Sequence, residues 1–334
     1  MLAAFPLVRA VSGCHFASVA CGGAEPPSAI EPASGQNARS RAAASPTAPS
    51  QEADFLAEAA PSASAQQGAC RKIDFLFVID NSLSMEREQS SLTRSFPRFM
   101  SVIARELRAA DFHVMVVDTD ALGPGEAVAA ETHAPSTPDE ICDVTLGGGR
   151  RSTRTGTDCE LPLGERFIAA DQPDLASAFA CVGQVGTAGS SYEQPVGALL
   201  EATSAALAAP GACNRSFLRD DAVLVVTLVT DEDDAVTTGQ PAAWRETLLR
   251  AKRGDESALV LLGLVSDRNR PQALPGGPCA TLDAAGAPRL QSFVSSFRFG
   301  SLGAVCAADY TPFFEQAVSV IGDACHEFVP PEIR

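Results

Sequence analysis

Oxygen-bearing side chains stand at alternate positions in the stretch Asp80-Asn81-Ser82-Leu83-Ser84, which directly follows the apolar run IDFLFVI. Because every second residue of an extended chain faces the same way, one carboxylate and two hydroxyl groups can converge on a single point. Hard oxygen ligands of this kind suit Mg²⁺, Mn²⁺ or Ca²⁺ far better than zinc or copper. The spacing therefore indicates a divalent-cation site. Two of its three ligands are neutral, so the ion would keep much of its positive charge.

The same pattern has an ordinary structural alternative, a polar turn that caps the following helix. Its position favours the metal site, since it lies between an apolar strand and an amphipathic helix predicted over 86–109. A second acid, Asp231, ends another strongly apolar run, AVLVVTLVTD. In a parallel sheet the carboxyl ends of the strands meet at one edge, where ligands bind. We therefore expect Asp80 and Asp231 at the same edge.

Apolar strands alternate with amphipathic helices along the chain. This order predicts an α/β fold, a doubly wound and mostly parallel central sheet with helices on both faces. Apolar runs predict strands over 72–80, 112–120, 222–234 and 258–267, and RFIAA favours another short strand. Helical spacing predicts further helices over 174–182, 193–209, 241–252 and 311–325. Residues rich in glycine and proline predict a loop insertion over 121–165 and a second loop-rich segment over 268–309.

Composition bounds the class of protein and its partners. The 334 residues carry 25 basic and 41 acidic side chains, a net charge of −16, which disfavours nucleic acid as a partner. Residues 1–21 are apolar and rich in small side chains ahead of a cysteine, which predicts a signal peptide of the bacterial lipoprotein type, lipidated at Cys21 or Cys14. Residues 22–69 are rich in Ala, Ser and Pro and predict a disordered tether. A folded domain over 70–329 and a tail over 330–334 follow.

No later stretch is long and apolar enough to span a bilayer. We therefore expect membrane contact only through an N-terminal lipid anchor, in an exported protein of the cell envelope.

The stretch FLFVIDNSLSM, with VVTLVTDEDD about 150 residues further on, resembles a von Willebrand factor type A (vWA) domain. It is more narrowly similar to an exported bacterial branch with DNSxSM and VTDEDD motifs, and VGTAGSSYEQPVGALLEA and CNRSFLRDDAVL add to the likeness. The resemblance covers residues 70–329. It implies a metal-ion-dependent adhesion site in which Asp80, Ser82 and Ser84 form the first loop and Asp231 belongs to the third.

The second loop of such a site supplies a threonine, and two positions compete for it. Thr187 is favoured because it follows Gly186 as the family threonine follows a glycine. Counting back from the next helix instead places Glu193 there, with Ser190 between the two. A charged Glu193 would bind the ion more tightly and weaken its capture of a partner.

Other carboxylates invite other interpretations. The run Asp231-Glu232-Asp233-Asp234 predicts a hydrated acidic loop, or a second Ca²⁺ site that would make Asp233 a weaker metal ligand. Asp118-Thr119-Asp120 resembles the DxD of metal-dependent glycosyltransferases, but no sugar-nucleotide signature accompanies it. Asp80 could be a phosphoryl acceptor of the haloacid dehalogenase type, but those enzymes have an Asp where Ser82 stands.

Eight of the ten cysteines follow the N-terminal segment, and none forms a CxxC pair, which leaves zinc-finger and thioredoxin interpretations unsupported. An even, widely spaced set predicts disulfides formed in an oxidising compartment, with buried free thiols as the alternative. Connectivity is open. The enclosed loops favour two pairs and the vWA resemblance two more, namely Cys142–Cys159, Cys279–Cys306, Cys181–Cys213 and Cys70–Cys325.

Three functions are compatible with these features. The favoured one is a lipid-anchored binding module that holds Mg²⁺, or Mn²⁺ or Ca²⁺, and captures an acidic side chain of a protein partner. The second is a structural envelope scaffold whose metal site is satisfied internally. The third is a metal-dependent enzyme, which we disfavour because no residue set supplies a nucleophile together with a base.

Overall fold

The computed structural model describes residues 71–107, 109, 111–120, 137–153, 155–162, 164–190, 192–266 and 286–331. These residues form a six-stranded sheet with the order β3-β2-β1-β4-β5-β6. Neighbouring strands are parallel except for β2 and β3. The chain winds outward in opposite directions from β1 and β4, so the strand order reverses there. The strands are β1 (Lys72–Ile79), β2 (Asp111–Asp118), β3 (Ile168–Ala169), β4 (Val223–Thr230), β5 (Leu259–Val265) and β6 (Gly300–Ala304).

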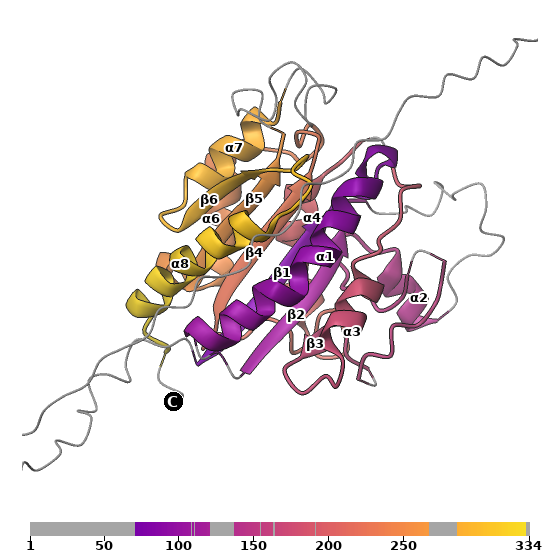
Figure 1. The fold of residues 1–334 in the computed structure, drawn as a ribbon, viewed down its shortest axis with the longest axis horizontal. Coiled ribbons are helices and arrows are strands. Elements are labelled where there is room, and N and C mark those ends of the chain that lie inside the picture. The colour runs from indigo at the N-terminus through magenta and orange to yellow at the C-terminus, as the bar shows by residue number, and fades with distance from the viewer. Residues whose placement is uncertain are drawn as a thin grey trace, which may run out of the picture. The chain divides into compact units, whose positions relative to one another are not determined.

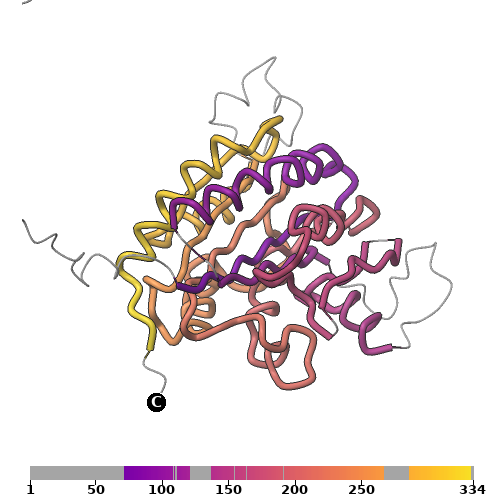
Figure 2. The backbone as a smooth tube through the Cα atoms, turned by 60° about the horizontal axis from the view of Figure 1, so that its bottom comes forward, coloured from indigo at the N-terminus to yellow at the C-terminus, as the bar shows by residue number. Residues whose placement is uncertain are grey.

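Helices cover both faces of the sheet, because alternate side chains of each strand point to opposite sides. Phe75 and Phe77 of β1 belong to one hydrophobic core with α1, α3 and α8, and Leu76 and Val78 to another with α4, α6 and α7. Figure 1 shows α1 and α8 side by side in front of the sheet, and Figure 2 shows them as a separate layer. The predicted doubly wound α/β fold is confirmed. The longer helices are α1 (Glu86–Val102), α3 (Leu175–Val182), α4 (Pro195–Ala202), α6 (Pro241–Ala251), α7 (Pro288–Ser295) and α8 (Thr311–Glu327).

The structure differs from the prediction in its shorter elements. The helix predicted over 193–209 is two helices, and the segments predicted as loops contain α2, α7 and β6. Strand β6 has the sequence GSLGA, which contains two glycines and no β-branched residue and therefore gives no local signal for a strand. It is a strand because it pairs with β5. A capping box between Thr137 and Glu140 starts α2, a signal that was readable in TPDE. The short segments are η2 (Leu83–Met85), the π-helical η3 (Ile103–Leu107), α2 (Pro138–Asp143), α5 (Ala205–Ala208) and η4 (Glu256–Ala258).

Two disulfides connect elements that the sequence argument had not joined. The bonds are Cys142–Cys213 and Cys159–Cys181, so the predicted pairs Cys142–Cys159 and Cys181–Cys213 are wrong. The prediction assumed that the insertion closes on itself, whereas Cys142 bonds to Cys213, which precedes β4, and Cys159 bonds to Cys181 of α3. The other two predicted pairs include Cys70 and Cys279, outside the described residues; Cys306 and Cys325 are disulfide-bonded.

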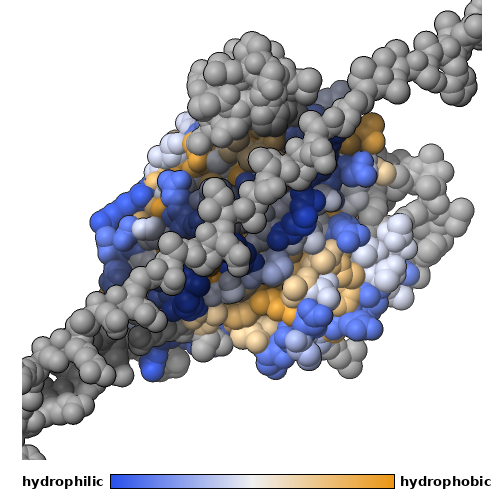
Figure 3. Space-filling model, viewed as in Figure 1, coloured by the Kyte–Doolittle hydropathy of each residue, from blue (hydrophilic) through white to orange (hydrophobic). Residues whose placement is uncertain are grey.

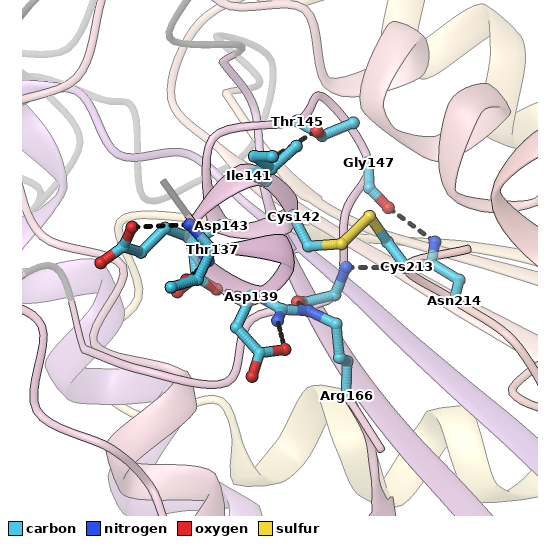
Figure 4. Close-up of a disulfide and its surroundings, with 12 residues drawn as sticks. Thr137, Asp139, Ile141, Cys142, Asp143, Thr145, Gly147, Arg166, Cys213 and Asn214 are labelled. Carbon is cyan, nitrogen blue, oxygen red and sulfur yellow. Dashed lines mark hydrogen bonds and ion pairs between the residues drawn. A yellow bond between two sulfur atoms is a disulfide. The ribbon is translucent and has the colours of Figure 1, made fainter. Parts of the chain in front are cut away.

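Polar contacts hold α2 and the residues that follow it beside the first disulfide, as Figure 4 shows. Asn214 donates to the carbonyl oxygen of Gly147 at 2.7 Å and accepts from the backbone N–H of Gly149 at 2.8 Å. Arg166 pairs with Asp139 at 3.0 Å and with Asp143. The insertion is therefore a packed substructure that combines α2 with covalent bonds to the domain, and such bonds are typical of oxidising compartments.

No helix in the described ranges is both long and apolar enough to cross a membrane. The predicted signal peptide, with Cys14 and Cys21, and the predicted tether lie outside those ranges, as do residues 332–334 of the predicted tail.

A buried ionic cluster closes the amino ends of the strands, opposite the candidate site. Asp74 of β1 is fully buried and accepts from the backbone N–H and the Nε of Arg219, each at 2.8 Å. Lys252 donates to the carbonyl oxygens of Arg219 and Ala222 at 2.6 and 2.7 Å. Burial raises the pKa of Asp74 to about 6, although the charge of Arg219 opposes this rise.

We expect Asp74→Asn to change how stability depends on pH. An unfolded Asp loses its proton near pH ~4, whereas Asp74 holds its proton up to about pH 6 in the folded state. The protonated form therefore stabilises the fold at low pH, and this contribution is lost as the pH rises through 6. Relative to the variant, the native protein should lose about 3 kcal/mol of unfolding free energy between about pH 4 and pH 7. Urea unfolding of both proteins across this range measures the difference, and parallel pH curves would contradict it.

Candidate metal centre

Asp80 is held rigidly at the carboxyl end of β1, where the strand order reverses. Its backbone N–H extends the ladder to β4 by donating to the carbonyl oxygen of Val229 at 3.0 Å. Its side chain is fully buried. One carboxylate oxygen accepts from the backbone N–H of Ser82 at 2.7 Å, and the other accepts from the hydroxyl of Thr230 at 2.6 Å. Strand β4 and the loop after β1 thus orient the first predicted ligand.

A chain of side-chain oxygens runs from the first loop to the third. Ser82 Oγ lies 3.1 Å from Ser84 Oγ, and Ser84 donates to Asp231 Oδ1 at 3.1 Å. In an octahedral Mg²⁺ shell with bonds of about 2.1 Å, adjacent ligand oxygens lie about 3.0 Å apart. The side-chain oxygens of Ser82, Ser84 and Asp231 are gathered at nearly this spacing, and the carboxylate of Asp80 is bound to the backbone N–H of Ser82 beside them.

The second loop is attached to the first by backbone and side-chain hydrogen bonds. The N–H of Gly189 donates to the carbonyl oxygen of Asn81 at 2.9 Å. Gln89 of α1 donates from one nitrogen to the carbonyl oxygens of Asp80, at 3.0 Å, and Gly186, at 2.7 Å. Thr187 lines a cavity of about 490 Å³ together with Gln89 and other polar residues of α1. Thr187 directly follows Gly186, whose carbonyl oxygen Gln89 connects to that of Asp80 in the first loop.

The other second-loop candidates face the end of β2. Ser190 donates its N–H to Asp120 at 2.7 Å, and its hydroxyl accepts from the N–H of Tyr192 at 3.0 Å. Glu193 is buried and accepts from the hydroxyl of Thr119. Burial, followed by the charge of Asp80, raises the pKa of Glu193 to about 9. Burial and the neighbouring carboxylates therefore disfavour the charged form of Glu193. The choice between Thr187 and Glu193 stays a prediction.

Asp233 and Asp234 serve as helix caps, which corrects the expectation of a hydrated acidic loop. Asp234 is fully buried and accepts from the N–H of Val196, near the start of α4, at 2.8 Å. Asp233 accepts from the N–H groups of Arg289 and Leu290, at the start of α7, each at 3.0 Å. Neither helix has a side-chain cap from its own N-cap residue. The unpaired N–H groups and positive ends of the two helices attract these carboxylates. Metal binding by Asp233 stays a weaker prediction, because its carboxylate already accepts from two N–H groups of α7.

Buried polar atoms without a hydrogen-bond partner are concentrated around Asp80. Of seven such side-chain atoms in the described residues, four belong to the loops beside it, namely Asn81 Oδ1, Asn81 Nδ2, Asp120 Oδ1 and Glu193 Oε1. A fifth, Glu88 Oε2, belongs to a carboxyl whose pKa is raised by burial and by the charges of Asp231 and Asp80. Buried unpartnered oxygens mark places where an ion or water completes the structure.

The charged form of Asp80 is destabilised by its surroundings, and a nearby cation would stabilise it. Burial raises its pKa to about 6 against the hydrogen bonds from Thr230 and Ser82, and the charge of Asp231 adds to the rise. No group of three or more His, Cys, Asp or Glu suited to a metal exists among the described residues. A cation here would thus depend on the serine hydroxyls as well as on carboxylates, a donor set that suits Mg²⁺ rather than zinc.

Gly189 allows the close approach of the first two loops. A Cβ atom at this position would lie 2.1 Å from Asn81 Oδ1, and Asn81 is fully buried beside Asp80. We expect Gly189→Ala to displace Asn81, to lower the unfolding free energy by about 1–3 kcal/mol and to weaken Mg²⁺ binding. Gly322→Ala is the control, because its Cβ would meet only Leu107 Cδ2, at 3.4 Å. Equal Mg²⁺ affinity of both variants, measured by calorimetry, would contradict this role.

Sequence reasoning missed Thr230, Gln89 and Thr119, which all position the predicted residues. Thr230 directly precedes Asp231 in the run LVTD and could have been found there. The local sequence gives no signal for Gln89 or Thr119. Gln89 contacts Gly186, which is 97 positions further along the chain, and Thr119 contacts Glu193, which is 74 positions further along.

No family model matches this chain, and no curated protein matches it. Among solved structures, proximal thread matrix protein 1 from the mussel byssus aligns with a TM-score of 0.41 and 10% sequence identity. The alignment covers 75% of this chain and 49% of that one, so this chain spans about half the length of the mussel protein. The α/β architecture follows from the strand order and register of this chain.

Proposed function

We propose that this chain is a vWA-type binding module of the cell envelope, held by an N-terminal lipid anchor, that binds Mg²⁺ (or Mn²⁺ or Ca²⁺) and an acidic side chain of a protein partner. The supporting observation is the run of oxygens from Ser82 through Ser84 to Asp231, beside the buried carboxylate of Asp80. The reversal of strand order at β1 and β4 supports the same location, and the disulfides fit an exported protein.

Each residue has a distinct task in this proposal. Asp80 and Asp231 supply negative charge, while the hydroxyls of Ser82 and Ser84 supply neutral oxygens. Thr230 fixes the carboxylate of Asp80. When bound, the cation supplies an open coordination position that accepts a partner's carboxylate. A site with few charged ligands favours such capture because the cation remains electron-poor.

A pull-down from envelope extract tests this function. The full chain should retain a partner in Mg²⁺, and both EDTA and Asp80→Ala should abolish the retention. Asp323→Ala, which removes an exposed carboxylate from the last turns of α8, is the matched control and should bind normally. Retention of the same partner in EDTA and by Asp80→Ala would refute the proposal.

A second candidate, a structural scaffold, has one observation in its favour. The hydrogen bonds from Thr230 to Asp80 and from Ser84 to Asp231 already satisfy part of both carboxylates within the chain. Such a protein would bind its partners through other surfaces, so its retention in the pull-down would be indifferent to EDTA.

A further inference from the structure

Five large apolar side chains are exposed in the described part of the chain, and three of them lie on the loops that carry predicted metal ligands. Leu83 lies between the two serines of the first loop, Tyr192 lies in the second loop, and Val236 lies in the third. Among the described residues two other large apolar side chains are exposed, one on α2 and one after α8. The full set is Leu83, Ile141, Tyr192, Val236 and Val329.

The three loops that carry these side chains are held together. The N–H of Gly189 in the second loop donates to Asn81 in the first, and Ser84 donates to Asp231 in the third. Leu83 is 83% exposed and Tyr192 is 74% exposed, so both project from this rim into solvent. Figure 3 shows an apolar patch over the start of α1, where the first loop ends. Apolar and aromatic side chains grouped in this way are typical of protein contact sites.

The charge around this rim restricts what can bind. Glu86 and Arg87 are exposed at the start of α1, Glu88 is buried there, and Glu232 is half-buried next to Asp231 in the third loop. Acids therefore outnumber bases on these segments. A partner with a run of acidic residues would be repelled outside the one position that contacts the cation. A partner with a single acidic residue and uncharged neighbours avoids this repulsion.

We propose that the three exposed side chains form an apolar collar, defined as Leu83, Tyr192 and Val236, which selects a partner segment with one acidic residue flanked by large apolar side chains. This inference rests on the proposed function, since the acidic residue would bind at the cation. The cation provides the metal-dependent contact, and the collar provides specificity by removing the flanking side chains from water.

Selection from a phage-displayed library of random peptides tests the collar. The full chain is presented in Mg²⁺, and bound phage are eluted with EDTA. We expect the enriched peptides to share one Asp or Glu between Leu, Ile, Phe or Trp residues. Synthetic copies should bind Leu83→Ser/Tyr192→Ser about tenfold more weakly than the native chain, and Ile141→Ser as well as the native chain. Stabilisation by Mg²⁺ should persist in the double variant, which shows that its metal site remains intact.

The outcomes separate this inference from the function on which it rests. Peptides that bind equally in EDTA or to Asp80→Ala would overturn the proposed function. Metal-dependent peptides with polar or acidic flanks, or with unchanged affinity for the double serine variant, would overturn the collar alone. Failure to enrich any peptide that EDTA releases would overturn the proposed function together with the collar, because both require metal-dependent capture of an acidic segment.

Discussion

Addition of Mg²⁺ is expected to raise the melting temperature of the native chain and to leave that of Asp80→Ala unchanged. At a Mg²⁺ concentration of about 100 times the dissociation constant, binding adds about 2.7 kcal/mol to the unfolding free energy. For a domain of this size the gain corresponds to about 5–10 °C. The reason is local: the buried carboxylate of Asp80 lies beside the unpaired oxygens of Asp120 and Glu193, and a cation relieves the cost of burying them.

Thermal unfolding followed by circular dichroism, with Mg²⁺ and with EDTA, measures this effect. Asp231→Ala should behave like Asp80→Ala, since its carboxylate ends the same run of oxygens. Asp323→Ala removes an exposed carboxylate on α8 and should keep the full response to Mg²⁺. An equal response in all four proteins would place any bound cation elsewhere.

Removal of the Cys142–Cys213 disulfide is expected to destabilise the domain by about 4 kcal/mol, and removal of Cys159–Cys181 by about 3 kcal/mol. The bonds close loops with sequence separations of 71 and 22 residues. In the chain-entropy description a longer closed loop restricts the unfolded chain more strongly. The paired variants Cys142→Ala/Cys213→Ala and Cys159→Ala/Cys181→Ala avoid new free thiols, and urea unfolding of each measures the loss.

The two variants are also expected to differ in their consequences for the candidate site. Cys181 belongs to α3, which leads into the second loop, whereas Cys142 belongs to α2 in the insertion. Loss of Cys159–Cys181 should therefore weaken Mg²⁺ binding, and loss of Cys142–Cys213 should leave it near the native value. A larger stability loss for the shorter loop, or Mg²⁺ affinities in the reverse order, would contradict these roles.

Much of the architecture was predictable from contiguous residues. The buried strands at 72–80, 112–120, 222–234 and 258–267 correspond to β1, β2, β4 and β5, because long apolar runs bounded by polar residues suit strands that are covered on both faces. Strand β6 was not predictable from its own residues, since GSLGA carries no strand preference and depends on pairing with β5. The convergence of Asp80, Ser82, Ser84 and Asp231 was predictable, because two parallel strands that end in polar residues share one edge.

By itself the sequence determined the alternation of strands and helices, the position of the oxygen-bearing loops and the presence of an even set of cysteines. Only the tertiary structure decided which cysteines pair, that Asp233 and Asp234 cap α7 and α4, and that Thr230 and Gln89 orient Asp80. Local patterns record the periodicity of burial along one segment. The disulfides, helix caps and hydrogen bonds named above join side chains that are far apart in the chain, up to 150 positions for Thr230 and Asp80. These contacts exist only once the helices have packed on the sheet.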